Sequence, residues 1–294
     1  MRPRERSRPP SRGEGSIWTA SRSMPAPSVG HASITAERAR STGRAIAGFG
    51  LVILAWEVFA RSGALPRAIT PTTIEILGAV AHMARTGSLF VHVSYTLVRI
   101  GAGLVAAAAI GVPLGMLMGR APRVERFALP LVSVLNPIPS LAWVPVLILW
   151  FGLGNTASIA LVFYAAVFPL ILNTWTGVRS VNGLWIRAAE AMGASPGVVF
   201  RRVILPGALP FVIAGLRQAF ARGWIAVVGG EMIAATSWGL GWVIFDSKEF
   251  LNADVMLGAL AVIGLLGLGF ERFVFGALER RTVERWGMVH TARV

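Results

Sequence analysis

The sequence contains no cysteine. Without cysteine the chain can form no disulfide framework, no thiolate metal site and no cysteine nucleophile. The histidines do not lie at metal-ligand spacings, and no nucleophile is paired with a general base. The sequence therefore predicts neither an enzyme nor a metal site. The histidines are His31, His82, His92 and His290.

Charged residues are also scarce. Only 14% of the residues are charged, compared with about 25% in a typical soluble domain, whereas 54% are hydrophobic. The apolar residues gather in runs of about 20, the length that a helix needs to cross about 30 Å of hydrocarbon. The composition therefore predicts an all-α polytopic membrane protein.

Lysine is nearly absent, since Lys248 is the only one, and the net charge of +14 comes from arginine. A basic protein that binds nucleic acid carries a basic stripe on a soluble fold. Here the arginines cluster at the ends of the apolar runs, where the charge bias of membrane proteins places them. This distribution predicts a lipid bilayer as the partner and no nucleic acid.

We expect six transmembrane helices and a cytoplasmic loop that contains short helices. Residues 1–43 are too polar and too rich in Arg, Pro and Ser to bury a core, so we predict a disordered cytoplasmic tail. Residues 44–278 form the transmembrane domain, and residues 279–294 form a basic cytoplasmic C-terminus. The expected spans are 43–61, 99–119, 128–150, 156–178, 208–235 and 254–276.

The arginines also predict the orientation of the chain. They concentrate before the first span, after the second, after the fourth and at the C-terminus, and such segments face the cytoplasm. Both termini are therefore expected inside. The loop at 62–98 is long enough to hold an amphipathic surface helix that begins near Pro71.

Three glycines recur every four residues in the second apolar run, at Gly111, Gly115 and Gly119. Small residues at this spacing form a stripe on one helix face and let another helix approach closely. The stripe predicts helix packing, and a channel-lining role is the alternative.

The loop at 182–204 carries consistent local signals. Asn182 is a good N-cap for a first short helix, and Gly193 suits the left-handed position that ends it. Ser195-Pro196 begins a second short helix, which we expect to end at Leu205-Pro206. The loop is thus predicted as helix, turn and helix on the cytoplasmic side.

Two interpretations of this loop are open from its local signals. It can rest on the bilayer surface with Arg201 and Arg202 toward lipid phosphates. Alternatively, it can enter a groove in a cytoplasmic partner, because the small Ala188 and Ala189 allow close approach.

Polar residues inside apolar runs usually face a pore or a partner, because hydrocarbon does not solvate them. The fifth run contains Arg217, Arg222 and Glu231, and the third contains Asn136 in the sequence Asn136-Pro137-Ile138-Pro139. These four residues are candidates for a translocation pathway, with Arg222 as a contact for an anion. The two prolines predict a broken helix.

A structural explanation is open for the same side chains. Arg217 and Arg222 can extend to the cytoplasmic interface, or they can pair with Glu231 or Glu57. Glu231 itself fits packing near a gate better than ligand binding.

The loop also has an identifiable pattern, which is Ala188-Ala189, three residues, Gly193, nine residues and Val203-x-Leu205-Pro206. It resembles the "EAA" loop in permease subunits of binding-protein-dependent ABC importers. The stretches 135–155, 168–181 and 231–244 look like the branch that imports aliphatic sulfonates, taurine, nitrate or bicarbonate, and some thiamine-precursor pyrimidines. The resemblance covers about residues 45–287.

The chain departs from the family pattern in three places. Arg187 stands where a glutamate usually opens the loop motif, and Glu190 lies one turn on. Asn155 stands where glutamate is frequent, and Asn136 stands where the family often has arginine.

The resemblance implies the permease subunit of an ABC importer in the bacterial inner membrane, which forms the pathway for a small anionic solute, with aliphatic sulfonate or taurine favoured. The implied partners are two ATP-binding subunits, a second permease copy that completes a homodimer, and a periplasmic solute-binding protein. The chain has no Walker A sequence. It is expected to bind no cofactor, and ATP and magnesium would be used by the partner ATPase.

The resemblance also implies which residues couple the chain to its ATPase. A secondary transporter or channel that acts without an ATPase is the alternative, but it would need mid-membrane carboxylates and inverted repeats, neither of which is clear here. The expected coupling-loop residues are Ala188, Ala189, Glu190, Gly193, Ala194, Val203, Leu205 and Pro206.

Overall fold

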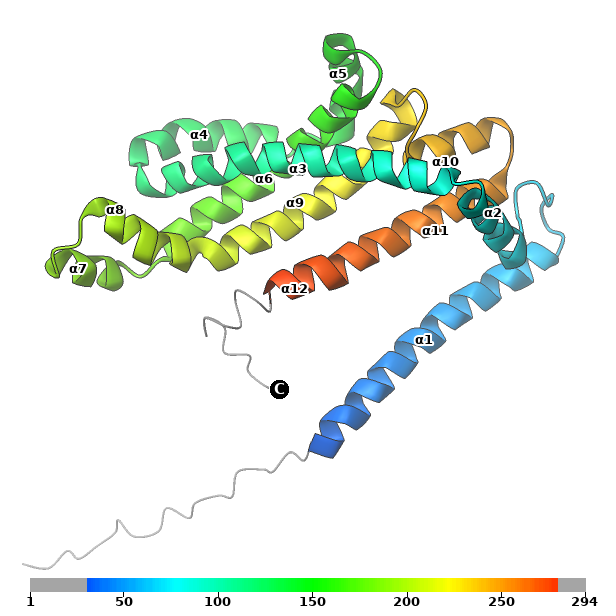
Figure 1. Cartoon of the computed structure of the whole chain (residues 1–294), viewed down its shortest axis with the longest axis horizontal. Helices are drawn as coiled ribbons and strands as arrows, with labels where there is room; N and C mark the ends of the chain where they lie inside the picture. The colour runs from blue at the N-terminus through cyan, green and yellow to red at the C-terminus, as the bar shows by residue number, and fades with distance from the viewer. Residues whose placement is uncertain (1–30, 280–294) are drawn as a thin grey trace, which may run out of the picture. The chain divides into compact units, whose positions relative to one another are not determined.

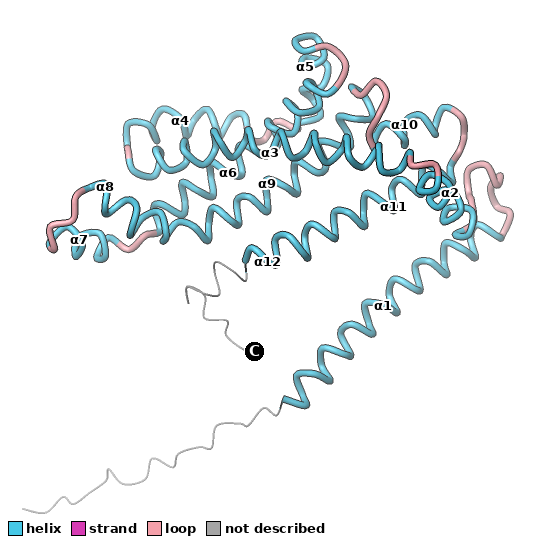
Figure 2. The backbone as a smooth tube through the Cα atoms, viewed as in Figure 1, coloured by secondary structure: helices cyan, strands magenta, loops and turns pink. Residues whose placement is uncertain are grey.

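The computed structural model describes residues 31–279. Within that range every regular element is a helix and none is a strand (Figure 2). This confirms the all-α prediction. The chain divides into two compact units, residues 1–54 and residues 55–294.

Helix α1, His31–Arg61, accounts for all of the first unit that the structure describes and continues into the second. The predicted disordered tail covers residues 1–43, and α1 begins within that range, at His31. Residues 31–43 contain no proline and include Ala, Glu and Arg, which favour helix. The remainder of the predicted tail, and the C-terminal segment from residue 280, lie outside the described residues.

Three long helices form the core of the second unit. They are α3, Ser88–Arg120, α6, Asn155–Ser180, and α9, Leu205–Ala234. The helices run side by side (Figure 1), and their facing sides bury a continuous apolar core. All three are long and apolar enough to cross a membrane.

A fourth apolar helix follows at the C-terminal side. Helix α11, Ala253–Gly269, continues through a π-helical segment, η3, Phe270–Phe275, into the short α12, Gly276–Glu279. The described residues thus contain four candidate spans, or five if one bent helix pair counts as a span. The predicted count of six is not confirmed, and α1 is not among the candidate spans found in the described residues.

The bent pair lies where the sequence predicts a broken helix. Helix α4, Pro122–Leu135, is followed by the 3-10 segment η1, Ser140–Trp143, and by α5, Val144–Phe151. The two halves bend by 88° at residues 136–139. Proline has no N–H to continue the helical hydrogen bonds, so the prediction of a break is confirmed. The predicted span at 128–150 corresponds to this bent pair, if the two halves together count as one span.

The two ends of the core differ. At one end, α7, Gly183–Ala191, α8, Pro196–Val199, and the π-helical segment η2, Phe200–Ile204, connect α6 to α9. The opposite end carries α10, Leu240–Glu249, and α2, Thr73–Arg85 (Figure 1).

Helix α2 confirms the helix expected near Pro71. It starts with a capping box, in which the Glu75 N–H donates to the Thr72 hydroxyl and the Thr72 N–H donates to the Glu75 carboxylate at 2.7 Å. These hydrogen bonds, above all the one from the Thr72 N–H, hold the pKa of Glu75 below its ordinary value. The capping box therefore stabilises α2 above the ordinary pKa of glutamate and loses that contribution as the pH falls below it.

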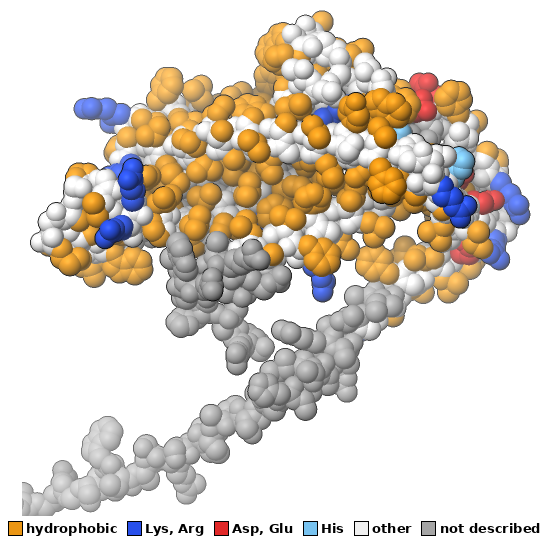
Figure 3. Space-filling view, viewed as in Figure 1, with side chains coloured by type: hydrophobic (Ala, Val, Ile, Leu, Met, Phe, Trp, Pro, Cys, Tyr) orange, Lys and Arg blue, Asp and Glu red, His pale blue; other side chains and the backbone are white. Residues whose placement is uncertain are grey.

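The surface is consistent with a membrane environment. Hydrophobic side chains cover the visible flank of the long helices, and most charged side chains lie toward the two ends (Figure 3). Large apolar side chains of the long helices are exposed, among them Val98, Val105 and Leu117 on α3. A soluble monomer rarely exposes so extended an apolar surface, whereas lipid chains would cover it.

The glycine stripe of α3 packs against α6. A methyl group added at Gly115 would lie 2.6 Å from the Ile171 carbonyl oxygen, and one at Gly119 would lie 2.5 Å from the Val178 Cβ atom. Gly111 has a similarly close neighbour in α6. These contacts favour the packing interpretation over a channel lining, because the stripe is covered by another helix of the same chain.

Replacing Gly115 with valine is expected to destabilise the folded chain by about 1–3 kcal/mol, because the added atoms force α3 and α6 apart. Gly101 of α3 offers a matched control, since a methyl group there meets no atom within 4 Å. Thermal unfolding in detergent should show a lower midpoint for Gly115→Val and a near-unchanged midpoint for Gly101→Val. Equal midpoints would contradict the packing role.

Candidate functional site

The loop between α6 and α9 folds as the local signals predict. The Leu184 N–H donates to the Asn182 side-chain oxygen at 2.9 Å, which confirms the N-cap of α7. At the other end of α7, Gly193 has φ +80°. The Gly193 N–H donates to the Glu190 carbonyl, and the Ala194 N–H donates to the Ala189 carbonyl. This pair of hydrogen bonds is the Schellman arrangement that ends a helix with a left-handed glycine.

An internal apolar cluster holds α7 against the elements that follow. Ala189 is buried in this cluster with Val199 and Ile204, against Val178 of α6. Ala189 therefore packs inside the chain, whereas its neighbour Ala188 is exposed. The expectation that both alanines face a partner is wrong for Ala189.

The outer side of the loop is apolar and exposed. Leu184 is 59% exposed, Trp185 is 58% exposed and Met192 is 82% exposed. Glu190 and Gly193 are exposed as well, whereas Ala194, Val203 and Leu205-Pro206 are half-buried. An exposed group of large apolar side chains at the end of a helical bundle is suited to a protein partner or to the membrane interface.

The second short helix does not end at Leu205-Pro206, which corrects the prediction. Helix α8, η2 and α9 form one continuous helical path. The Leu205 N–H donates to the Phe200 carbonyl, five residues earlier, as a π turn requires. Proline normally ends a helix because its ring clashes with the carbonyl four residues earlier. The widened π turn carries the backbone past Pro206. Because the helical path is continuous, a movement of the loop would be transmitted directly to α9.

The broken helix and Arg222 meet at a second location. Arg222 Nη1 donates to Asn136 Oδ1 at 2.9 Å, and the Tyr164 hydroxyl donates to the Leu135 carbonyl at 2.7 Å. The Leu135 carbonyl also accepts from the Ile138 N–H, so it stays satisfied although Pro139 has no N–H to donate to it. A cavity of about 460 Å³ opens here, lined by Asn136, Ser140, Tyr164 and Arg222 among others. The structure therefore brings together two of the predicted pathway residues, and Arg222 is exposed to the cavity.

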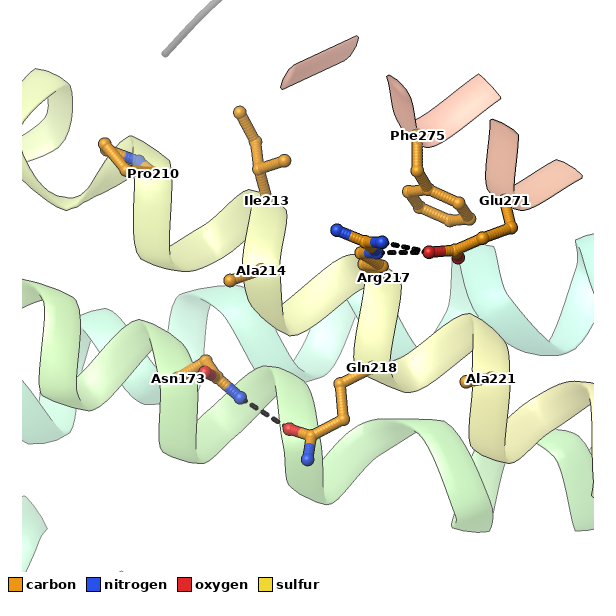
Figure 4. Close-up of a pocket in the computed structure, with 9 residues that line it drawn as sticks. All are labelled: Asn173, Pro210, Ile213, Ala214, Arg217, Gln218, Ala221, Glu271 and Phe275. Atoms are coloured by element: carbon orange, nitrogen blue, oxygen red, sulfur yellow. Dashed lines mark hydrogen bonds and ion pairs between the residues drawn. The ribbon is translucent and has the colours of Figure 1, made fainter. Parts of the chain in front are cut away.

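Arg217 faces a different cavity, of about 620 Å³, shown in Figure 4. Its guanidinium forms an ion pair with Glu271 of η3, with Arg217 Nε donating to Glu271 Oε1 at 2.6 Å. On the other wall, Asn173 Nδ2 of α6 donates to Gln218 Oε1 of α9 at 2.9 Å. No local sequence pattern indicates that Glu271 is the partner of Arg217, which lies 54 residues away.

Glu231 is the fourth predicted pathway residue, and its partners lie outside both of these cavities. Its side chain is fully buried and accepts hydrogen bonds from Arg99 Nη1 at 2.8 Å, from the Thr96 hydroxyl and from the Gly241 N–H. Arg99 also donates to Asn155 Oδ1 and to the Trp238 carbonyl. Glu231 of α9 therefore binds α3 and the start of α10 near the end opposite the α7–α8 loop, and Arg99 adds Asn155 of α6 to the cluster.

This arrangement corrects two sequence expectations. Glu231 pairs with Arg99, and Glu57 pairs with Arg61, so neither carboxylate is the partner of Arg217 or Arg222. Glu231 is fully buried and has a structural role, and it lines neither of the two cavities described above. The sequence pattern does not single out Arg99, because its place at the start of an apolar run fits the membrane charge bias and its partner lies 132 residues away.

Within residues 31–279 no group of three or more His, Asp or Glu side chains is arranged to hold a metal ion. The candidate functional features among the described residues are the charged and amide side chains in the cavities beside α9, and the exposed α7–α8 loop.

Comparison with known proteins identifies relatives over most of the chain. The profile of the family described as "Binding-protein-dependent transport system inner membrane component" matches residues 111–283. The taurine transport system permease protein TauC of Escherichia coli (strain K12) is 38% identical over 224 residues, which are 76% of this chain and 80% of that protein. The putative aliphatic sulfonates transport permease protein SsuC of the same strain is 32% identical over 74% of this chain and 82% of that protein.

A solved structure supports the same fold. Inward-facing MetNI, a methionine ABC transporter, matches with a TM-score of 0.58 and 23% sequence identity, over 66% of this chain and 95% of that chain. The match shows that the chain shares the fold of that transporter chain over the aligned part.

Proposed function

Because the chain belongs to the family of inner membrane components of binding-protein-dependent transport systems, and is a permease subunit of an ABC importer, we propose that its solute is a small sulfonate, with taurine favoured. The names of two relatives support this choice, since one is a taurine permease and another a putative aliphatic sulfonate permease. Nitrate, bicarbonate and a thiamine-precursor pyrimidine are the other solutes considered.

The α7–α8 loop is the proposed attachment point for the ATPase. The supporting observation is the exposed apolar group Leu184, Trp185 and Met192, held on a rigid turn that leads directly into α9. A groove in an ATP-binding subunit would bury these side chains. A rigid-body movement of the loop would then be transmitted along α9, which borders both cavities.

The proposed assembly contains two copies of this chain, two ATP-binding subunits and a solute-binding protein outside the membrane. Hydrolysis of ATP with magnesium takes place in the ATP-binding subunits, so the permease itself is not an enzyme. The loop and both termini are proposed to face the cytoplasm, as the arginine distribution predicts.

A transporter that works without an ATPase is less well supported. It would need a carboxylate available to a coupling ion within the membrane. Within the candidate spans of the described residues, Glu125, Glu231 and Glu271 are each held by an arginine, and Asp254 lies in the first turn of α11, at the end of its span.

The anionic group of the solute is proposed to bind Arg222, in the cavity beside the broken helix. None of the described residues that line this cavity is a carboxylate, and Arg222 donates a hydrogen bond there to Asn136 Oδ1. A sulfonate can accept two parallel hydrogen bonds from a guanidinium. The bend at residues 136–139 places Asn136 beside it and would help to orient the anion.

Replacing Arg222 with glutamine is expected to lower ATP-dependent sulfonate uptake by about tenfold, the effect of one lost charge-assisted hydrogen bond. The measurement is uptake into proteoliposomes that contain the complete importer, with ATP hydrolysis recorded in parallel. Arg126→Gln, an exposed arginine in the first turn of α4, is the control and should retain wild-type uptake. Normal uptake by Arg222→Gln with normal ATP hydrolysis would remove the anion contact from the proposal.

A further inference from the structure

The cavity between α6, α9 and η3 has an unusual lining (Figure 4). Its volume is about 620 Å³, and it contains one cation and one anion, Arg217 and Glu271. Both remain accessible in the chain, since their side chains are 49% and 40% exposed. The pair therefore lines an open space and is not sealed in the core, in contrast to the pair of Arg99 and Glu231.

The opposite wall supplies neutral polar groups. Asn173 Nδ2 donates both to the Pro169 carbonyl and to Gln218 Oε1. Among the described residues, Asn173 Oδ1 and Gln218 Nε2 take part in no further hydrogen bond, so one acceptor and one donor are available to a solute. The remaining lining is apolar, with Ile213 and Phe275 as its large side chains.

The charge balance of this cavity differs from that of the Arg222 cavity. Arg222 has no carboxylate beside it, whereas Arg217 and Glu271 neutralise one another. A solute with a single negative charge that bound Arg217 would displace Glu271 and leave that carboxylate unpaired. A solute with both charges can replace the pair, because its anionic group binds Arg217 while its ammonium group binds Glu271.

We propose that this cavity is a solute subsite that selects zwitterionic aminosulfonates over sulfonates of the same size that lack the amine. The inference rests on the proposed function and specifies its solute class. Arg217 holds the sulfonate, Glu271 holds the ammonium group, and Gln218 and Asn173 offer hydrogen bonds from the facing wall. The π-helical geometry of η3, which carries Glu271, is frequent at functional positions in helices.

A purely structural role for the pair makes a different prediction. If Glu271 only ties η3 to α9, its loss would slow the uptake of every solute in the same proportion. If Glu271 binds the ammonium group, its loss would affect only the solute that has one. The ratio of two uptake rates separates these cases.

The test compares taurine with isethionate, its analogue with a hydroxyl in place of the amine, in proteoliposomes that contain the complete importer. The same binding protein is used throughout, so its own selectivity cancels between wild type and variant. Glu271→Gln is expected to lower the ratio of taurine to isethionate uptake by about tenfold, as loss of a hydrogen bond to a charged group predicts. Glu271→Asp, which keeps the carboxylate, should restore most of the ratio.

Glu125→Gln is the matched control, because Glu125 also pairs with an exposed arginine, Arg179, but lies outside the cavity. Its ratio should equal that of the wild type. An unchanged ratio in Glu271→Gln would overturn the subsite. Absence of ATP-dependent uptake of both sulfonates by the wild type would instead refute the proposed function, and the subsite with it.

A second measurement needs no variant and no partner. Bound solute raises the unfolding temperature of the protein that binds it. Taurine should stabilise the purified wild-type chain at a lower concentration than isethionate does, and equal stabilisation would count against the subsite even if Glu271→Gln failed to fold.

Discussion

Replacing Gly193 with valine is expected to abolish association with the ATP-binding subunit and to reduce ATP-dependent uptake to background. Gly193 has φ +80°, a conformation that costs an L-residue about 1–2 kcal/mol and that is still less favourable for a β-branched one. The substitution would break the two hydrogen bonds that end α7 and would change the angle between α7 and α8. The exposed Leu184, Trp185 and Met192 would then no longer present one continuous surface.

The measurements are co-purification with the ATP-binding subunit and hydrolysis of ATP stimulated by the binding protein. Gly197→Val is the matched control in the same loop, since Gly197 lies in the first turn of α8, has no positive φ, and would meet no atom within 4 Å. It should retain association and uptake. If Gly193→Val associated and transported normally, the loop would not be the site of coupling.

Replacing Glu231 with alanine is expected to destabilise the folded chain by about 3–5 kcal/mol, the cost of leaving a buried charge without its partner. Arg99 is only 3% exposed and would lose its carboxylate in the core. The Thr96 hydroxyl and the Gly241 N–H would lose their acceptor in the same substitution. Because this cluster joins α3, α9 and the start of α10, we expect little folded permease in the membrane.

Two further variants show whether the unpaired charge is responsible. The double variant Arg99→Leu with Glu231→Leu removes both charges and should recover much of the lost stability, since apolar replacements of a buried ion pair are often tolerated. Glu125→Ala breaks the more exposed pair with Arg179 and should cost less than about 1 kcal/mol. Thermal unfolding in detergent and the amount of chain in the membrane are the readouts. Similar losses for Glu125→Ala and Glu231→Ala would contradict this explanation.

Local features were predictable because they depend on neighbouring residues. Asn182 and Gly193 set the ends of α7 through hydrogen bonds that span only a few residues. The two prolines at residues 136–139 broke the helix for the same kind of reason, a missing donor in the local backbone. The continuation through Leu205-Pro206 was not predicted, because it depends on a π turn that the proline pattern does not indicate.

The partners of the charged side chains were not predictable in this way. Glu231 lies 132 residues from Arg99, and Glu271 lies 54 residues from Arg217. Sequence reasoning instead considered Glu231 or Glu57 as partners of Arg217 and Arg222, and both assignments were wrong. Which carboxylate meets which arginine depends on the rotation and offset of packed helices, and those are set by contacts such as Gly115 against Ile171.

By itself the sequence determined that this chain is helical, that it belongs in a membrane, and that a two-helix loop with a left-handed glycine lies between its apolar segments. Those properties follow from composition and from backbone preferences that act over a few residues. Only the tertiary structure decided that Glu231 is a buried partner of Arg99 and that Arg217 and Glu271 share a cavity. Side chains distant in sequence meet only when whole helices pack in register, and no local signal encodes that register.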